Sequence, residues 1–475
     1  MTFILSIVTL PLYTRLLTPK EFGITALFML FGKLIFGFIN FNLHAASYRY
    51  FFQIENKEFK LLNSANLIFL FFITFIILIL FIFLGDWVSY FFHDKQLTKK
   101  FFILSFISAY LDYLFLYFTT LLTAEQKAVR FSILNILNIL LNLIFSLFFI
   151  IYFKLTFLGR IYGILISQII IISLSFLYCK RLIKFTFKKY YLFKSLKFTL
   201  PMYPNMVLGL SQGYLDKSLI SKINGNTSLG FFTIGANFAN ILKTIMDSIE
   251  KAWSPFFYKK ALENTAESKE EIANKFFTLA FAYMTIGLSV IYFSDEAITL
   301  LTTKDYYPAI YIVPIYIYFY LFAIFGYLAN AQLSISEKLQ YLLPGAVAGA
   351  LVNIILNLIL ISKFGPIGAS ISSAFTALVS QVLIYKYGMK YFPLPIKSSD
   401  ILKAYLLLIL YTLFFYIILY FNINIFLKIV IKIILLITFL FIGIKLKYLN
   451  LNLLKPFILN NKICYKLLNK LKINA

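Results

Sequence analysis

The stretch LIFLFFITFIILILFIFL (Leu67–Leu84) decides the fold class of this chain. Thr74 is its one polar side chain, and its apolar residues form a continuous run with no alternation. A strand of an outer-membrane barrel would alternate apolar and polar residues over about 10 positions. A continuous run of about 18 apolar residues is long enough to cross the hydrocarbon core of a bilayer. The stretch therefore predicts a membrane-spanning helix.

The composition extends this prediction to the whole chain. Of 475 residues, 61% are hydrophobic, against about 45–50% in soluble domains, which excludes a soluble globular enzyme. The predicted fold is an all-α integral membrane protein with about fourteen transmembrane helices. The predicted spans are 2–17, 24–43, 67–84, 101–122, 131–153, 161–177, 200–220, 231–253, 276–293, 308–328, 342–361, 367–387, 401–421 and 425–444.

The charge of +25 is distributed between the apolar runs and not on a separate basic domain. We therefore interpret it as an orientation signal and expect no nucleic-acid partner. With the N-terminus inside, the inner segments hold 27 Lys and Arg and the outer loops ten, which predicts that both termini are cytoplasmic. The first span has no charged region before it and no small-residue cleavage site after it, so we expect no removable signal peptide; an upstream start site is left open.

Residues that support catalysis are sparse. Two cysteines (Cys179, Cys464) and two histidines (His44, His93) form no disulfide framework and no clustered metal set. We also find no phosphate-binding Gly-rich loop and no soluble segment large enough for an ATPase. The sequence thus predicts no enzyme activity, no catalytic residues, no metal site and no cofactor, and it leaves the coupling ion or membrane potential undetermined.

Weak internal similarity indicates a duplication. At an offset of 207 residues, Gly23 aligns with Gly230 and Ala45 with Ala252. Two six-helix lobes would have the same orientation because six is even, which makes a parallel repeat of the kind found in alternating-access transporters. The predicted organisation is an N-terminal lobe (1–178), a basic cytoplasmic linker (179–198), a C-terminal lobe (199–390), two additional transmembrane helices (391–444) and a basic cytoplasmic tail (445–475).

Three segments resemble the polysaccharide-export flippases, the O-antigen (Wzx-type) members of the multidrug/oligosaccharidyl-lipid/polysaccharide superfamily. These are LPLYTRLLTPKEFGI (Leu10–Ile24), LPMYPNMVLGLSQGYLDKSLI (Leu200–Ile220) and VNIILNLILISKFGPIGASIS (Val352–Ser372). The likeness covers about the first 390 residues, and the last two spans fit the fourteen-helix variant. One departure is Lys217, where many relatives carry Arg, which replaces a bidentate contact with a point charge.

The resemblance implies a function and a setting. Such flippases move an undecaprenyl-diphosphate-linked oligosaccharide from the cytoplasmic to the outer leaflet by alternating access, for O-antigen or capsule synthesis. The resemblance also implies a MATE-like V-shaped pair of helix bundles around a cationic cavity, in a bacterial inner membrane. The implied partners are the polyprenyl-diphosphate-linked glycan, membrane lipids and the polysaccharide polymerase machinery. The glycan itself and the oligomeric state are not readable from the sequence.

Charged residues inside predicted spans are candidate site residues, because a charge at bilayer depth costs about 2.5–3.5 kcal/mol. Lys33 and Lys243 lie too deep in their spans to reach the interface comfortably. They either line a cavity for an anionic headgroup or form structural pairs, Lys33 with Asp112 and Lys243 with Asp247. We expect the two lysines to attract the diphosphate jointly.

Other cations lie near the ends of spans. Arg15, Arg49 and Lys217 either grip phosphate oxygens or anchor helices at the interface, and Asp216 either serves the site or only neutralises Lys217. Lys428 and Lys432 lie in the first turns of the last span, so the sequence predicts that their side chains reach the interface and have no role in the site. The same prediction applies to Lys403.

The fifth span carries a polar stripe within an arc of about 60°, at 100° per residue. It either forms a cavity wall for sugar hydroxyls or provides interhelical hydrogen bonds. The stripe consists of Ser132, Asn135, Asn138, Asn142 and Ser146.

Two other functions compete with a flippase. A cation-coupled multidrug exporter of the same superfamily would favour twelve spans and an acidic or aromatic site. A membrane-embedded glycosyltransferase or ligase would normally have a large outer loop with paired acids, whereas the longest outer loop here, 85–100, is sixteen residues.

Overall fold

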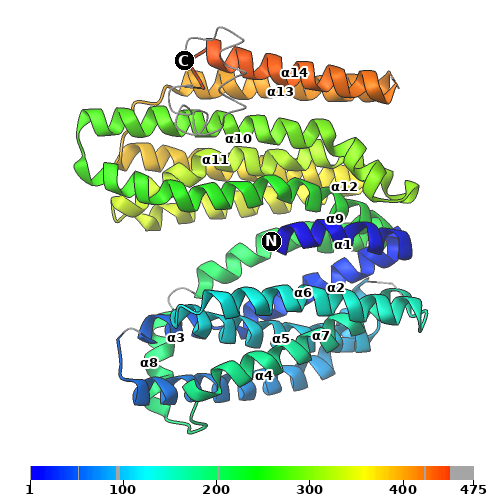
Figure 1. Ribbon diagram of the computed structural model, residues 1–475, viewed down its shortest axis with the longest axis vertical. Coiled ribbons are helices and arrows are strands. Elements are labelled where there is room, and N and C mark those ends of the chain that lie inside the picture. The colour runs from blue at the N-terminus through cyan, green and yellow to red at the C-terminus, as the bar shows by residue number, and fades with distance from the viewer. Residues whose placement is uncertain (1, 52, 93–96, 201–202, 422–423, 450–475) are drawn as a thin grey trace. The chain divides into compact units, whose positions relative to one another are not determined.

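The computed structural model describes residues 2–51, 53–92, 97–200, 203–421 and 424–449. This part of the chain is almost entirely helical (Figure 1), as apolar runs of this length require, because a helix satisfies its own backbone groups in lipid. The all-α prediction is confirmed. The α-helices are α1 (Thr2–Leu16), α2 (Pro19–Ile39), α3 (Leu43–Phe51), α4 (Asn56–Phe92), α5 (Lys99–Ala124), α6 (Ala128–Ile151), α7 (Thr156–Cys179), α8 (Lys189–Thr199), α9 (Tyr203–Glu263), α10 (Ala266–Leu301), α11 (Val313–Ile335), α12 (Leu342–Tyr391), α13 (Ser398–Tyr420) and α14 (Ile425–Lys445), with 3-10 helices η1 (Lys180–Leu182), η3 (Lys304–Tyr311) and η4 (Leu339–Tyr341).

Eleven helices in the described ranges are long and apolar enough to cross a membrane. Two of the helices, α9 and α12, contain a non-helical glycine, Gly225 (φ 83°) and Gly365 (φ 56°). Glycine adopts positive φ without the steric cost that a Cβ imposes, and Pro366 after Gly365 cannot continue the preceding helical hydrogen bonds. With the halves of these helices counted separately, and with the shorter α1, the helices match the fourteen predicted spans.

The predicted start of the second span is wrong by five residues. Helix α2 begins at Pro19 because a capping box precedes it: the Glu21 N–H donates to Thr18 Oγ1 at 3.3 Å, and the Thr18 N–H donates to Glu21 Oε2 at 2.9 Å. A hydropathy window excludes these polar residues. As a consequence, Lys33 lies six residues before the end of α2, about 9 Å along the axis.

The predicted start of the tenth span is also wrong. Residues 304–311 form the 3-10 helix η3, and α11 begins at Val313 with Pro314 in its first turn. Proline is well tolerated there because the first N–H groups of a helix have no partner inside it. Pro314 thus starts this helix and does not kink it.

The chain divides into two compact units. Unit 1 comprises Met1–Thr233, Leu300–Tyr307 and Asn357–Ala369, and unit 2 comprises Ile234–Thr299, Pro308–Leu356 and Ser370–Ala475. The domain boundaries predicted from the sequence stay a prediction.

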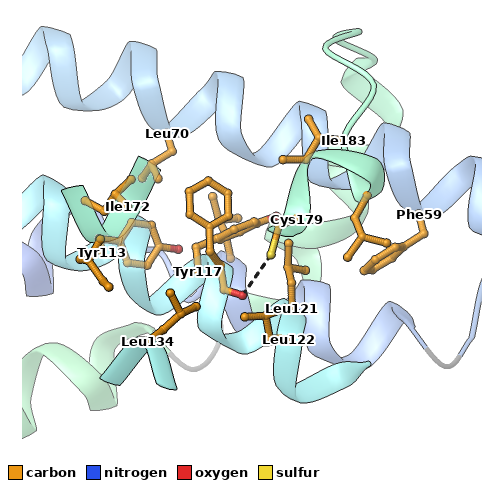
Figure 2. Packing of buried hydrophobic residues seen from close by; sticks show 14 residues of the cluster. Phe59, Leu70, Tyr113, Tyr117, Leu121, Leu122, Leu134, Ile172, Cys179 and Ile183 are labelled. Carbon is orange, nitrogen blue, oxygen red and sulfur yellow. Dashed lines mark hydrogen bonds between the residues drawn. The ribbon is translucent and has the colours of Figure 1, made fainter. Parts of the chain in front are cut away.

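Aromatic and aliphatic side chains from α3, α4, α5 and α7 form a buried cluster in unit 1 (Figure 2). Tyr117 lies at its polar edge: the hydroxyl donates to Asn63 Oδ1 at 2.9 Å and lies 2.7 Å from Ser47 Oγ. Cys179 is also buried there, and its thiol points to the Phe118 carbonyl oxygen at 3.5 Å. This cysteine therefore fills space in a packed core.

The predicted linker packs one face against unit 1. In α8, Tyr191 and Leu192 are buried against Leu61 and Leu62 of α4, whereas Lys197 is exposed. The helix is therefore amphipathic. An exposed basic face of this kind gains about 1 kcal/mol per Lys near an anionic lipid surface.

In unit 2, small residues allow the two halves of α12 to pack closely. A Cβ on Gly345 would meet the Ser380 carbonyl oxygen at 2.9 Å, and one on Gly349 would meet the Ser380 side chain at 3.0 Å. Close approach at small residues is the usual basis of helix association in membranes. Helices α13 and α14 lie side by side at the C-terminal end of the described chain (Figure 1).

Candidate functional site

Lys33 is presented outward by the packing of α2. The opposite face of the helix buries Ile35 and Ile39 against Phe106 and Ala109 of α5. This contact fixes the rotation of α2 about its axis and leaves the Lys33 side chain exposed on unit 1. Lys33 therefore presents an accessible ammonium close to the end of α2.

The positive charge of Lys33 acts on the carboxylate of Asp112 on α5. Its carboxylate accepts a hydrogen bond from Gln168 Nε2 of α7 at 2.7 Å, and the same amide nitrogen donates to Ser108 Oγ at 3.0 Å. A neutral amide therefore orients the carboxylate. The charge of Lys33 thus acts on Asp112, and whether the two form a structural pair or serve a cavity stays a prediction.

Lys217 on α9 extends this arrangement. The charge of Lys33 acts on the half-buried Lys217 ammonium, and so does the charge of the adjacent Asp216. The buried Asp216 carboxylate accepts from Asn357 Nδ2 at 2.6 Å. We call Lys33, Asp112 and Lys217 the basic cluster of unit 1.

The two predicted arginines have other surroundings. Arg15 is exposed in the last turn of α1. Arg49 in α3 stacks on Phe198 of α8, with its guanidinium carbon 4.4 Å from the ring centroid, a cation–π contact that suits the planar guanidinium. Arg49 thus ties α8 to α3.

The polar stripe of α6 is partly used for packing within unit 1. Asn142 Oδ1 accepts from the Tyr13 hydroxyl of α1 at 3.4 Å, and Ser146 is buried against Gly163 of α7. Asn135 Nδ2 donates to the carbonyl of its own helix at Phe131, at 2.9 Å. Asn135 and Asn138 are half-buried. The end of the stripe near Asn142 supports interhelical hydrogen bonding.

Arg160 of α7 is a residue that the sequence reasoning missed, because it lies one residue before the predicted span 161–177, whereas α7 begins at Thr156. Its guanidinium carbon lies 4.2 Å from the Tyr13 ring centroid and 4.9 Å from that of Phe22, and Nη1 donates to Thr25 Oγ1 at 2.9 Å. Arg160 therefore joins α7 to α1 and α2. No local sequence pattern indicates this contact, since its partners lie more than 130 residues away.

In unit 2, Lys243 forms the other predicted pair. Its ammonium lies 2.9 Å from Asp247 Oδ2, one turn along α9, and the Tyr327 hydroxyl donates to Asp247 Oδ1 at 3.4 Å. Both charged side chains are exposed. Glu250, which the sequence reasoning missed, lies three residues further and lines a small cavity of about 30 Å³ with Tyr327. The sequence pattern that could have indicated Glu250 is its i, i+3 spacing from Asp247.

The prediction that Lys428 and Lys432 are inert at the interface is wrong. Lys432 has no exposed surface, and its ammonium lies 2.5 Å from Asp295 Oδ1 and 2.7 Å from Glu296 Oε1. Lys428 forms an ion pair with Asp295 as well. We call these four residues, from α10 and α14, the four-charge network. The sequence of α14 alone could not indicate the two carboxylates, because they lie over 130 residues earlier in the chain than the lysines.

Comparisons with known proteins agree with this fold. A family model described as "Polysaccharide biosynthesis protein" matches residues 1–261. A comparison with curated protein sequences finds no match. Among solved structures, the lipid II flippase MurJ in an inward closed conformation has a TM-score of 0.71 at 19% identity, covering 94% of this chain and 97% of that one.

Two further solved structures are similar over 82% of this chain. An inward-facing multidrug resistance MATE family transporter has a TM-score of 0.65 at 15% identity and is 94% covered. A transporter of the same MOP superfamily from Pyrococcus furiosus has a TM-score of 0.57 at 15% identity and is 93% covered. At these identities the similarity establishes the fold.

Proposed function

Since the chain belongs to the polysaccharide biosynthesis protein family and is a multi-pass membrane protein with the fold of a lipid II flippase and of MATE transporters, we propose that it is a flippase for an undecaprenyl-diphosphate-linked oligosaccharide. It would move this lipid from the cytoplasmic to the outer leaflet by alternating access, for O-antigen or capsule synthesis. The family description supports a glycan substrate, and the membrane-embedded cations support an anionic headgroup.

The observation that carries this proposal is the basic cluster of unit 1. Lys33 and Lys217 act on each other electrostatically, and two like charges at membrane depth disfavour one another. A diphosphate placed beside them would replace this repulsion with attraction and would satisfy ammonium donors that lipid cannot. Asp112 and Asp216 each accept a hydrogen bond from an amide, and their charges compensate the two lysines in part, while the Lys33 ammonium stays exposed to a ligand.

A reconstitution experiment tests the substrate. Purified full-length protein in proteoliposomes should move a fluorescent polyprenyl-diphosphate-linked oligosaccharide between leaflets at least tenfold faster than protein-free liposomes. The same lipid with a neutral linkage in place of the diphosphate is the control, and it should show no acceleration. Equal acceleration of both lipids would contradict a headgroup-recognising flippase.

The proposed setting is a bacterial inner membrane with both termini in the cytoplasm, and the polysaccharide polymerase machinery is a proposed partner. The excess of Lys and Arg in the inner segments supports this orientation. Reporter fusions at Leu177 and Ala475 should both report a cytoplasmic location. Reporters on opposite sides would overturn the orientation.

One observation in unit 2 favours a second candidate, a cation-coupled multidrug exporter. Asp247 and Glu250 lie one turn apart on α9 with Tyr327 beside them, and carboxylates with aromatic rings bind organic cations. In that case cells that produce the protein should export a cationic dye, and Glu250→Gln should abolish the efflux. Dye retention together with glycan export would exclude this candidate.

A further inference from the structure

A cavity of about 470 Å³ lies in unit 2, away from the residues considered so far. It is formed by the third and fourth turns of α10, by the start of α13 with the segment before it, and by the residues that follow α14. The lining includes two cations, one carboxylate, two neutral polar side chains and a phenol. These are Lys397, Lys447, Asp400, Asn274, Thr278 and Tyr448.

The wall formed by the end of α14 is held in place. Tyr448 is buried, with its ring centroid 5.1 Å from that of Phe277 and 5.9 Å from that of Phe281 on α10. Its N–H donates to the Gly443 carbonyl at 2.8 Å, and Lys447 adopts a left-handed conformation with φ 60°. This turn closes α14 in the manner of a C-terminal cap and fixes the backbone at Lys447 next to the cavity.

The charges of the lining favour an anion. Lys397 and Lys447 are exposed and Asp400 is half-buried, so the lining has one net positive charge. The 450–475 segment of this chain is an unsuitable occupant because it adds five further lysines and no carboxylate side chain. The rest of the lining is apolar and includes Phe277, Ile396 and Leu446, and such side chains suit a ligand that is charged at one end and apolar at the other.

The cavity also lies where the apolar segments end. Helix α13 begins at Ser398 and α14 ends at Lys445, both next to the cavity. Just beyond it, Leu402 on α13 and Phe441 on α14 expose their apolar side chains. Exposed apolar residues of α13 and α14 thus follow within a few residues of the cavity lining, as the acyl chains of a lipid with its headgroup in the cavity require.

From this geometry we infer that the cavity binds the phosphate headgroup of an anionic phospholipid, with the ammonium groups of Lys397 and Lys447 on the phosphate oxygens. Basic pockets between transmembrane helices on the cytoplasmic side are a recognised form of lipid headgroup site. The glycerol would contact Phe277 and Leu446, and the acyl chains would follow α13 and α14. This site is independent of the transported lipid.

Binding of phosphatidylglycerol to the purified full-length protein in detergent, followed by native mass spectrometry, tests the inference. Lys397→Gln/Lys447→Gln should weaken binding about thirtyfold, since each lysine near a lipid phosphate contributes about a factor of five. The matched control is Lys386→Gln/Lys390→Gln, which removes two exposed lysines of α12 outside the lining and should change affinity less than threefold. Equal losses in both double variants would overturn the site.

A second variant separates the cavity from its charge. Asn274→Trp places a large side chain in the cavity from an exposed position of α10 and leaves the charge unchanged. It should weaken phosphatidylglycerol binding at least tenfold, while the thermal unfolding midpoint stays near that of the unmodified protein. Unchanged affinity would overturn the inference.

Three probes distinguish the source of the phosphate. Phosphatidylcholine, which is zwitterionic, should bind at least tenfold more weakly than phosphatidylglycerol, and inorganic phosphate should compete only weakly because it lacks acyl chains. The third probe is a polyprenyl diphosphate. If Lys397→Gln/Lys447→Gln weakened binding of this lipid and left phosphatidylglycerol binding unchanged, the assignment to a phospholipid would be overturned. Because binding is measured without transport, failure here leaves the flippase proposal intact, and failure of transport leaves this site intact.

Discussion

In unit 2, Lys432 has no exposed surface and contacts two carboxylates. In unit 1, by contrast, Lys33 is exposed, and its positive charge acts on a second lysine, Lys217. Both occur in apolar helices and have the same intrinsic cost in lipid. What separates them is direct pairing and exposure. Lys432 contacts its carboxylates away from solvent, whereas the Lys33 ammonium is exposed and can contact a ligand.

The largest effect is expected at Lys432. Lys432→Met leaves the buried Asp295 and the half-buried Glu296 with one remaining cation, so we expect a loss of about 3–5 kcal/mol in the free energy of unfolding, the usual cost of breaking a buried pair. Thermal or denaturant unfolding of the purified protein in detergent measures it. The matched control, Lys403→Met, removes an exposed lysine of α13 and should have little effect. An unchanged midpoint for Lys432→Met would show that the four-charge network is not structural.

The comparison also shows how far the sequence alone leads. Fourteen apolar runs were found because hydropathy is local, and the pairing of Lys243 with Asp247 was expected because i, i+4 residues share a helix face. The network at Lys432 was missed because its partners on α10 are 136 and 137 positions away. Tertiary contacts of that separation leave no pattern in a single chain.

Helix starts were misjudged for a related reason. The hydropathy window for α2 rejected Thr18, Pro19 and Glu21, although these polar residues form its cap. The cap is itself a sequence signal, since Thr and Glu three residues apart before an apolar run predict a helix start. A search for caps beside the hydropathy windows would have placed Lys33 correctly within its helix.

The second largest effect is expected at Lys33. Lys33→Glu reverses the charge beside Lys217 and would repel a diphosphate, so glycan export should fall about ten- to hundredfold, the range of one hydrogen bond to a charged group. Membrane abundance should stay near that of the unmodified protein because the side chain is exposed. Cell-surface glycan labelling measures export, and quantitative immunoblotting measures abundance. Normal export would remove the cationic mechanism and leave the flippase proposal dependent on family membership alone.

A smaller and opposite effect is expected at Asp112. Asp112→Asn removes a negative charge that acts on Lys33, while Gln168 still has an oxygen to which it can donate. The basic cluster becomes more positive, so the apparent KM for the diphosphate-linked substrate in proteoliposomes should fall about threefold, within the range of an exposed charge interaction. Asp305→Asn, at an exposed residue of η3, is the control and should leave KM unchanged. A raised KM would mean that Asp112 serves the substrate directly.

The smallest effect is expected at Lys243, although the sequence placed it beside Lys33 as an equal contributor to the site. Its ammonium is already paired with Asp247 on the same helix, and Glu250 adds a second carboxylate nearby. An exposed i, i+4 pair contributes only about 0.3–0.5 kcal/mol, and Lys243→Gln leaves the Tyr327 hydrogen bond to Asp247 in place. We therefore expect less than a twofold change in export and no measurable change in the unfolding midpoint, against the ten- to hundredfold loss for Lys33→Glu. Lys33→Gln, assayed beside it, matches the chemical change and should still lose at least fivefold. Equal losses for Lys33→Gln and Lys243→Gln would restore two equivalent cationic sites and would refute the distinction between the units.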